Sequence, residues 1–193
     1  ASIVTTAGNV TVSADDNDFS LDDNSGAITD NLTGEGGAAV NITGATVDLD
    51  AATGIGGGAT LGTADIDING TTLSAVNSTS GTINIAEVDS IALDDVTNAT
   101  RQVILDAGAA ISDNNAAANN ITAQTLEIRA VTGIGSGDSL ETDVNTLAAA
   151  NAIGGNIEID NVDAGNALLT LDTVPSGTLH GAVNTAAGGT IVI

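Results

Sequence analysis

The chain has 193 residues, of which 42% are hydrophobic and only 1% aromatic, with a single Phe and no Cys, Met, Trp or Tyr. Its 25 acidic residues against two basic ones give a formal net charge of -23. This charge argues against nucleic-acid and anionic-membrane binding, which need basic patches, and neither a bilayer-spanning apolar run nor a cysteine-based site is present in the sequence.

Short strands are expected along the whole chain. Each is marked by two apolar residues one position apart, so that one face is apolar and the other mostly polar. Clusters of Gly, Asn, Asp, Ser and Thr, which favour turns, separate the strands. In chain order the expected strands are 10–12, 19–21, 40–42, 47–49, 66–68, 83–85, 91–93, 126–128, 157–159, 169–171 and 191–193.

Helical patterns are weak. The Ala-rich stretches 107–120 and 147–153 lack an amphipathic stripe, and a polar cluster interrupts the first of them. Isolated short helices of this kind are marginal in water. We therefore interpret both stretches as Ala-lined turns, with at most one short helix.

The chain contains an internal repeat. Residues 46–58 return in similar form at 125–137, and residues 81–89 return at 155–163. Repeats of this kind indicate stacked units that cover one another's apolar faces. We expect one domain over 1–193, with related units at about 45–93 and 124–171.

The repeat and the strand pattern predict an all-β fold, a single-stranded parallel β-helix or β-solenoid. Its core of Ala, Val, Ile and Leu suits a narrow interior between short strands. At roughly 20 residues per coil, about nine or ten coils would stack into a rod on the order of 45 Å long.

Two Gly-rich segments, 54–58 and 133–137, superficially resemble phosphate-binding loops. A phosphate loop needs a following Lys, which this chain lacks, and a dinucleotide loop needs a strand followed by a helix. Because the segments recur within the repeat, we interpret them as turns.

Acidic clusters around residues 15–24 are the candidate metal site. Carboxylate oxygens suit Ca²⁺, and two adjacent turns would share one structural ion. Neither the EF-hand spacing nor a calcium-binding nonapeptide is present, and Asp and Asn are also ordinary turn residues. The candidate ligands are Asp15, Asp16, Asp18 and Asp22, with weaker candidates at Asp94, Asp95 and Asp113.

Catalytic patterns are missing from the sequence. His180 is the single histidine and belongs to no recognisable Ser/His/Asp set. The aromatic and basic side chains that usually contact sugars in β-helix enzymes are few, namely Phe19, Arg101 and Arg129. We expect no enzyme activity and no cofactor apart from structural Ca²⁺. Asn-x-Thr/Ser sequences, which exported chains can carry as glycosylation acceptors, begin at Asn9, Asn31, Asn41, Asn69, Asn77, Asn98 and Asn120.

Residues 132–149, followed by the Gly-x-Ile-x-Ile-x-Asn unit at 155–161, resemble a repeat of very large secreted bacterial proteins. These are the filamentous-haemagglutinin-like, β-strand-repeat surface adhesins. The resemblance covers mainly 124–171 and, more loosely, 45–93. It implies a parallel β-helix exported to the cell surface or the medium, where it serves in adhesion or as a stalk.

We therefore expect a structural, extracellular solenoid segment that acts as an adhesin stalk or as a self-assembling filament subunit. Both ends are strand-like and uncharged, and such edges favour end-to-end association with further strands. The alternative is an adhesin module that binds a glycan or a cell-surface ligand. A carbohydrate-active enzyme on the same fold ranks third, because a fold alone does not determine function.

Overall fold

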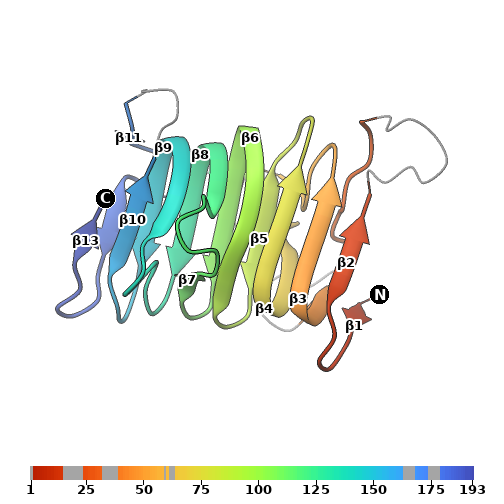
Figure 1. The fold of residues 1–193 in the computed structure, drawn as a ribbon, viewed down its shortest axis with the longest axis horizontal. Helices are drawn as coiled ribbons and strands as arrows, with labels where there is room; N and C mark the ends of the chain where they lie inside the picture. The colour runs from red at the N-terminus through yellow and green to blue at the C-terminus, as the bar shows by residue number, and fades with distance from the viewer. Residues whose placement is uncertain are drawn as a thin grey trace.

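The computed structural model describes residues 2–14, 24–31, 39–58, 60, 64–162, 168–173 and 179–193. The strands within these residues join into one sheet that winds into a tube, a parallel β-solenoid of about five turns (Figure 1). The two chain termini lie at opposite ends of the tube (Figure 1). The strands are β1 (Ile3–Val4), β2 (Val10–Ser13), β3 (Ile42–Ala51), β4 (Ile66–Asn77), β5 (Ile83–Glu87), β6 (Ile91–Ala107), β7 (Ile111–Asp113), β8 (Ile121–Ala130), β9 (Leu140–Asn151), β10 (Ile157–Asn161), β11 (Thr170–Leu171), β12 (Ala182–Asn184) and β13 (Ile191–Val192).

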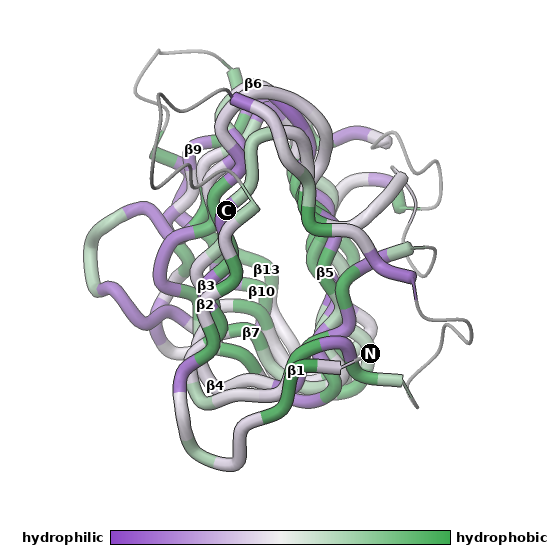
Figure 2. The backbone as a smooth tube through the Cα atoms, turned by 90° about the vertical axis from the view of Figure 1, so that its right-hand side faces the viewer, coloured by the Kyte–Doolittle hydropathy of each residue, from purple (hydrophilic) through white to green (hydrophobic). Residues whose placement is uncertain are grey.

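The coils stack in chain order. The main path runs β1-β3-β4-β5-β6-β8-β9-β10-β13, and all pairings between these named strands are parallel. Seen along the tube, β5 lies on one wall, while β2, β3 and β7 lie on the opposite wall (Figure 2). We call these the β5 wall and the β7 wall. The predicted parallel β-solenoid is thus confirmed.

Aliphatic columns fill the interior of the tube. Each column consists of residues that pair from coil to coil, so the same side of every coil faces inward. Fully burying one such side chain contributes roughly 1.5–3 kcal/mol. One column on the β5 wall is Ile55, Ile83, Val103, Leu126 and Leu147, and one on the β7 wall is Ile91, Ile111, Ile134 and Ile157; all of these side chains are buried.

The predicted number of coils, nine or ten, was too high, because the structure shows about five turns. The prediction assumed coils of uniform length. Ile66 pairs with Ile85 in the next coil, but Ile3 pairs with Ile42. The number of residues between paired positions thus differs from coil to coil, so some residues add nothing to the length of the rod. Ile55 and Ile66, for example, both pair with β5 although ten residues lie between them.

The Ala-rich stretches form strands and turns. The first begins at the end of β6 and includes β7, and the second lies largely within β9. No helix occurs among the described residues, so the short helix that the sequence allowed is not seen in them. The described part of the chain accordingly has no helix that is long and apolar enough to span a membrane.

The Gly-rich segments are corners with closely similar geometry. Gly54, Gly56 and Gly58 have φ values of 131°, 75° and 73°, and the matching residues 133, 135 and 137 have 129°, 59° and 96°. A Cβ on Gly56 would lie 2.4 Å from the carbonyl oxygen of Asn84, and one on Gly135 would lie 2.2 Å from that of Glu158. Only glycine fits such a position, which agrees with the turn interpretation.

The two copies of the repeat lie on opposite walls. Ile55 pairs with Ile83 of β5, whereas the matching Ile134 pairs with Ile111 of β7 (Figure 2). Each copy stacks on the second half of its own repeat, since Ile134 also pairs with Ile157. The repeat therefore encodes a strand, a glycine corner and the coil that packs on it, and it does not encode a whole number of coils.

Asparagine side chains satisfy backbone groups where the coils turn. Asn98 is 1% exposed and donates to the carbonyl oxygens of Gly81 and Gln102 at 3.3 and 2.9 Å. Asn77 of the preceding coil donates to Asn98 Oδ1 at 3.2 Å. Together with Asn120, these are buried members of Asn-x-Thr/Ser sequences, so their amides are inaccessible to a glycosylating enzyme in the folded chain.

Candidate functional site

The predicted calcium ligands Asp15, Asp16, Asp18 and Asp22 lie outside the described residues. The calcium site stays a prediction, which a change in melting temperature on adding EDTA would test. In the part of the chain that the structure describes, no group of three or more His, Cys, Asp or Glu side chains is placed to hold a metal ion.

The weaker acidic candidate Asp113 acts as a turn residue. Its carboxylate accepts hydrogen bonds from the Asn120 side-chain amide at 2.7 Å and from the backbone N–H groups of Asn115 and Ala116 at 2.8 and 3.1 Å. Desolvation raises the pKa of Asp113, but these hydrogen bonds outweigh it and the net shift is downward. Hydrogen-bond donors of the protein therefore stabilise the negative charge of the Asp113 carboxylate.

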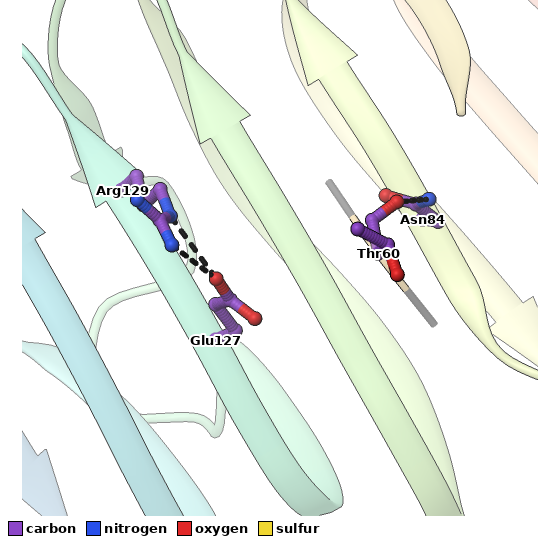
Figure 3. Close-up of polar contacts among 4 residues, drawn as sticks. All are labelled: Thr60, Asn84, Glu127 and Arg129. Carbon is purple, nitrogen blue, oxygen red and sulfur yellow. Dashed lines mark hydrogen bonds and ion pairs between the residues drawn. The ribbon is translucent and has the colours of Figure 1, made fainter. Parts of the chain in front are cut away.

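A row of buried side chains lies on the outside of the β5 wall. Asn84, Ile104, Glu127 and Ala148 pair from coil to coil, and each has no exposed surface. The Asn84 amide donates to the carbonyl oxygens of Gly57 and Thr60, both at 3.2 Å, so the loop after Ile55 covers this end of the row (Figure 3). Leu179 packs on Ala148 at the other end.

Charged groups gather on and beside this row. Arg129 donates through Nε and Nη2 to Glu127 Oε1 at 3.1 and 2.6 Å (Figure 3). Asp106 lies in the coil before Arg129 and pairs with it in register. Burial raises the pKa of Asp106, Arg129 lowers it, and Asp65 and Glu127 add to the rise. The charge of Arg129 is thus offset by the neighbouring carboxylates of Glu127 and Asp106.

The other cation, Arg101, lines an open cavity of about 300 Å³ at the corner where the chain passes from the β7 wall to the β5 wall. Residues 99–101 lie opposite the single residue Gln124 of the next coil, because Asn98 pairs with Ala123 and Gln102 pairs with Thr125. The extra residues shift the register as at a β-bulge, a feature that redirects side chains.

Three successive coils contribute to this corner cavity, each through a pair of adjacent residues. The pairs are Gly81 with Thr82, Arg101 with Gln102, and Gln124 with Thr125. The Arg101 side chain is exposed and forms no ion pair with any described residue.

Gln102 is the buried residue among those that line the corner cavity. It is only 6% exposed, and its amide nitrogen is buried without a hydrogen-bond partner in the part of the chain that the structure describes. Leaving such a donor unpaired costs about 1–3 kcal/mol. The cavity therefore combines a cation, an unsatisfied donor, a second amide and hydroxyl groups, which together suit a small polar anion.

The sequence pointed only weakly to this cavity. Arg101 stands out as one of two cations, but the bulge and the stacking of three residue pairs depend on register, which no local pattern reveals. His180 is exposed and its Nδ1 contacts the Thr173 hydroxyl. The expectation that the chain is not an enzyme stays a prediction.

Comparisons with models of protein families, with curated proteins and with solved structures find no match. The resemblance to filamentous-haemagglutinin-like repeats accordingly stays an expectation, and function must be argued from the fold and the cavity.

Proposed function

We propose that the chain is a structural segment of an exported bacterial surface protein, a β-solenoid that serves as a stiff stalk. The observation that carries this proposal is the continuity of the aliphatic columns. Ile91, Ile111, Ile134 and Ile157 are each at most 4% exposed and pair in unbroken succession along the tube. Each of these coils is thus paired with and packed on the next, which resists bending between them.

Composition supports an extracellular setting. A net charge of -23 keeps rods apart and soluble, and salt outside the cell would screen the repulsion between coils. The resemblance of residues 124–171 to secreted β-strand repeats points the same way, toward a stalk that holds other parts of an adhesin away from the cell.

Small-angle X-ray scattering of the purified chain in 0.15 M NaCl tests the stalk. We expect an elongated particle with a cross-section that stays constant along its length, together with a β-type circular dichroism spectrum. A compact, nearly spherical particle or a mostly helical spectrum would contradict the proposal. Detection of the chain on intact bacteria by surface-restricted protease digestion would test its location.

A filament is the second candidate, and the exposed strand edges favour it. Among the described residues, β1 pairs only with β3, and β13 pairs only with β10. Val4 and Val192 on these edge strands are 67% and 58% exposed. Unpaired apolar edges are templates for adding another strand, so a second copy of the chain would extend the sheet at either end.

Sedimentation velocity over a concentration series in 0.5 M NaCl tests the filament. We expect larger species to form as concentration rises, and Val4→Lys or Val192→Lys to abolish them by placing a charge on an edge. Val88→Lys is the matched control, because Val88 is 43% exposed on a turn within the stack. If the chain is a monomer at every concentration, the filament proposal is wrong and the stalk proposal is unaffected.

A further inference from the structure

We propose that the corner cavity at Arg101 binds a singly charged, hydroxylated carboxylate of monosaccharide size, a hexuronate unit of an acidic glycan. This ligand site is independent of the stalk proposal, because it would operate on any rod of this geometry. It would give a structural segment a binding function of its own.

The charge of the ligand follows from Arg101. Its guanidinium carries a planar set of donors that matches a carboxylate with two parallel hydrogen bonds. It forms no ion pair with a described residue, whereas Arg129 is bound to Glu127. The surrounding net charge of -23 repels anions in proportion to their own charge, so one negative charge is favoured over two.

The hydroxyl groups of the ligand follow from the rest of the lining. The buried Gln102 amide nitrogen has no partner among the described residues, and an acceptor such as a sugar hydroxyl would satisfy it. Gln124 and Thr125 add an amide and a hydroxyl from the next coil, and Thr82 adds a hydroxyl from the previous one. The Thr82 hydroxyl donates to the Gly58 carbonyl at 2.8 Å, which leaves its oxygen as an acceptor.

The size of the ligand follows from the cavity. About 300 Å³ is at the lower limit for small-molecule sites and suits one sugar ring. The described residues that line the cavity include no aromatic side chain to stack on a sugar face, so the recognition that they offer depends on hydrogen bonds and the carboxylate. The open corner lets neighbouring sugars of a chain extend into solvent.

NMR titration of the ¹⁵N-labelled full chain in 0.15 M NaCl tests the site. The probes are sodium galacturonate and sodium glucuronate, with glucose as the neutral control and phosphate as the doubly charged one. We expect saturable shifts of the Arg101 Nε–H and Gln102 amide signals with a uronate, and affinities at least tenfold weaker for glucose and for phosphate. Equal binding of glucose would overturn the role of Arg101, and equal binding of phosphate would overturn the assignment of a uronate.

Three variants separate binding from folding. Arg101→Ala should weaken uronate binding at least tenfold, and Arg101→Lys should recover only part of it because it lacks the planar fork. Gln102→Leu should weaken binding while leaving the urea midpoint unchanged or higher, since it removes an unpaired buried donor. Ala187→Glu, on an exposed turn, changes the net charge by the same amount as Arg101→Ala and should leave binding unchanged within twofold.

Absence of saturable shifts with both uronates would overturn the proposal. So would shifts that Arg101→Ala leaves unchanged, because these would place the ligand elsewhere. Uronate binding by an otherwise monomeric, elongated particle would support this site whether or not the stalk is exported, so the two proposals fail separately.

Discussion

Arg129 Nη2 donates to Glu127 Oε1 at 2.6 Å, although the two residues lie only two positions apart on the outer face of β8. Glu127 has no exposed surface, and the side chain of Arg129 is 25% exposed. The second oxygen, Oε2, is buried and has no hydrogen-bond partner among the described residues. The ion pair with Arg129 therefore offsets part of the cost of burying the Glu127 carboxylate beside the aliphatic side chains of its row.

Removing the arginine alone should destabilise the fold. Arg129→Met leaves Glu127 buried without its cation, and we expect the free energy of unfolding to fall by about 3 kcal/mol, measured by urea denaturation at pH 7. The double variant Glu127→Leu/Arg129→Met should recover most of this loss, because Ile104 and Ala148 flank the position in the row. A double variant as unstable as Arg129→Met would show that packing, and not the stranded charge, causes the loss.

Glu87 makes stability depend on pH. Burial raises the pKa of this inward-facing carboxyl to about 7, although N–H groups of Gly70 and Asp89 donate to it at 3.0 and 3.2 Å. Its contribution to stability is fully present below pH 4.5, the ordinary value, and is lost as pH rises through about 7. Discounted for solvent screening, the loss is about 2 kcal/mol.

The Glu87→Gln variant isolates this effect from the other carboxylates. We expect the stability of the variant relative to the original chain to increase by about 2 kcal/mol between pH 5 and pH 8, as urea midpoints would show. The difference between the two proteins is the relevant quantity, because burial also raises the pKa of Asp67 and Asp106. A difference that is constant with pH would contradict a buried, titrating Glu87.

Two adjacent glycines provide a matched pair. A Cβ on Gly155, where φ is 79°, would lie 2.3 Å from the carbonyl oxygen of Thr132, whereas a Cβ on Gly154 would meet nothing within 4 Å. We expect Gly155→Ala to lower the free energy of unfolding by at least about 2 kcal/mol, and Gly154→Ala to change it by less than about 0.5 kcal/mol. Thermal unfolding of both variants checks this, and similar effects would refute the proposed corner geometry.

Replacing the Asn98 amide with a carboxyl group should make the stability of the fold depend on pH. In Asn98→Asp an ionised carboxylate would face the carbonyl oxygens of Gly81 and Gln102, which now accept hydrogen bonds from the amide. We expect a loss of about 3 kcal/mol at pH 8 and a smaller one at pH 4, where the carboxyl is protonated and keeps one donor. Asn9→Asp, at an exposed position, is the control and should show no such difference.

Most of the architecture could be predicted because it depends on short-range patterns. The alternation in 83–85 and 157–159 identifies inward columns, and the recurring glycines identify corners whose φ values only glycine adopts readily. The number of coils could not be predicted, since it depends on which polar stretches are corners and which are loops. Ten residues separate Ile55 from Ile66, which both pair with β5, whereas five separate Ile134 from Leu140, which both pair with β10.

The candidate site was much less predictable. The acidic cluster around Asp15 was the predicted metal site, but it lies outside the described residues. Arg101, which lines the cavity, belongs to no recognisable sequence motif. Its cavity arises only because residues 99–101 oppose Gln124 and because three coils align their corners. Register between coils joins residues about a coil apart, and no local sequence pattern encodes it.

The sequence by itself determined that this chain is a narrow, acidic, aliphatic-cored β-solenoid, because side-chain alternation and glycine corners act within a few residues. The tertiary structure decided how many coils form, that the repeated segments lie on opposite walls, and that Glu127 is buried while Arg101 forms no ion pair with a described residue. These properties depend on which coil stacks on which, and stacking is fixed by packing and hydrogen bonding between residues that are distant in the chain.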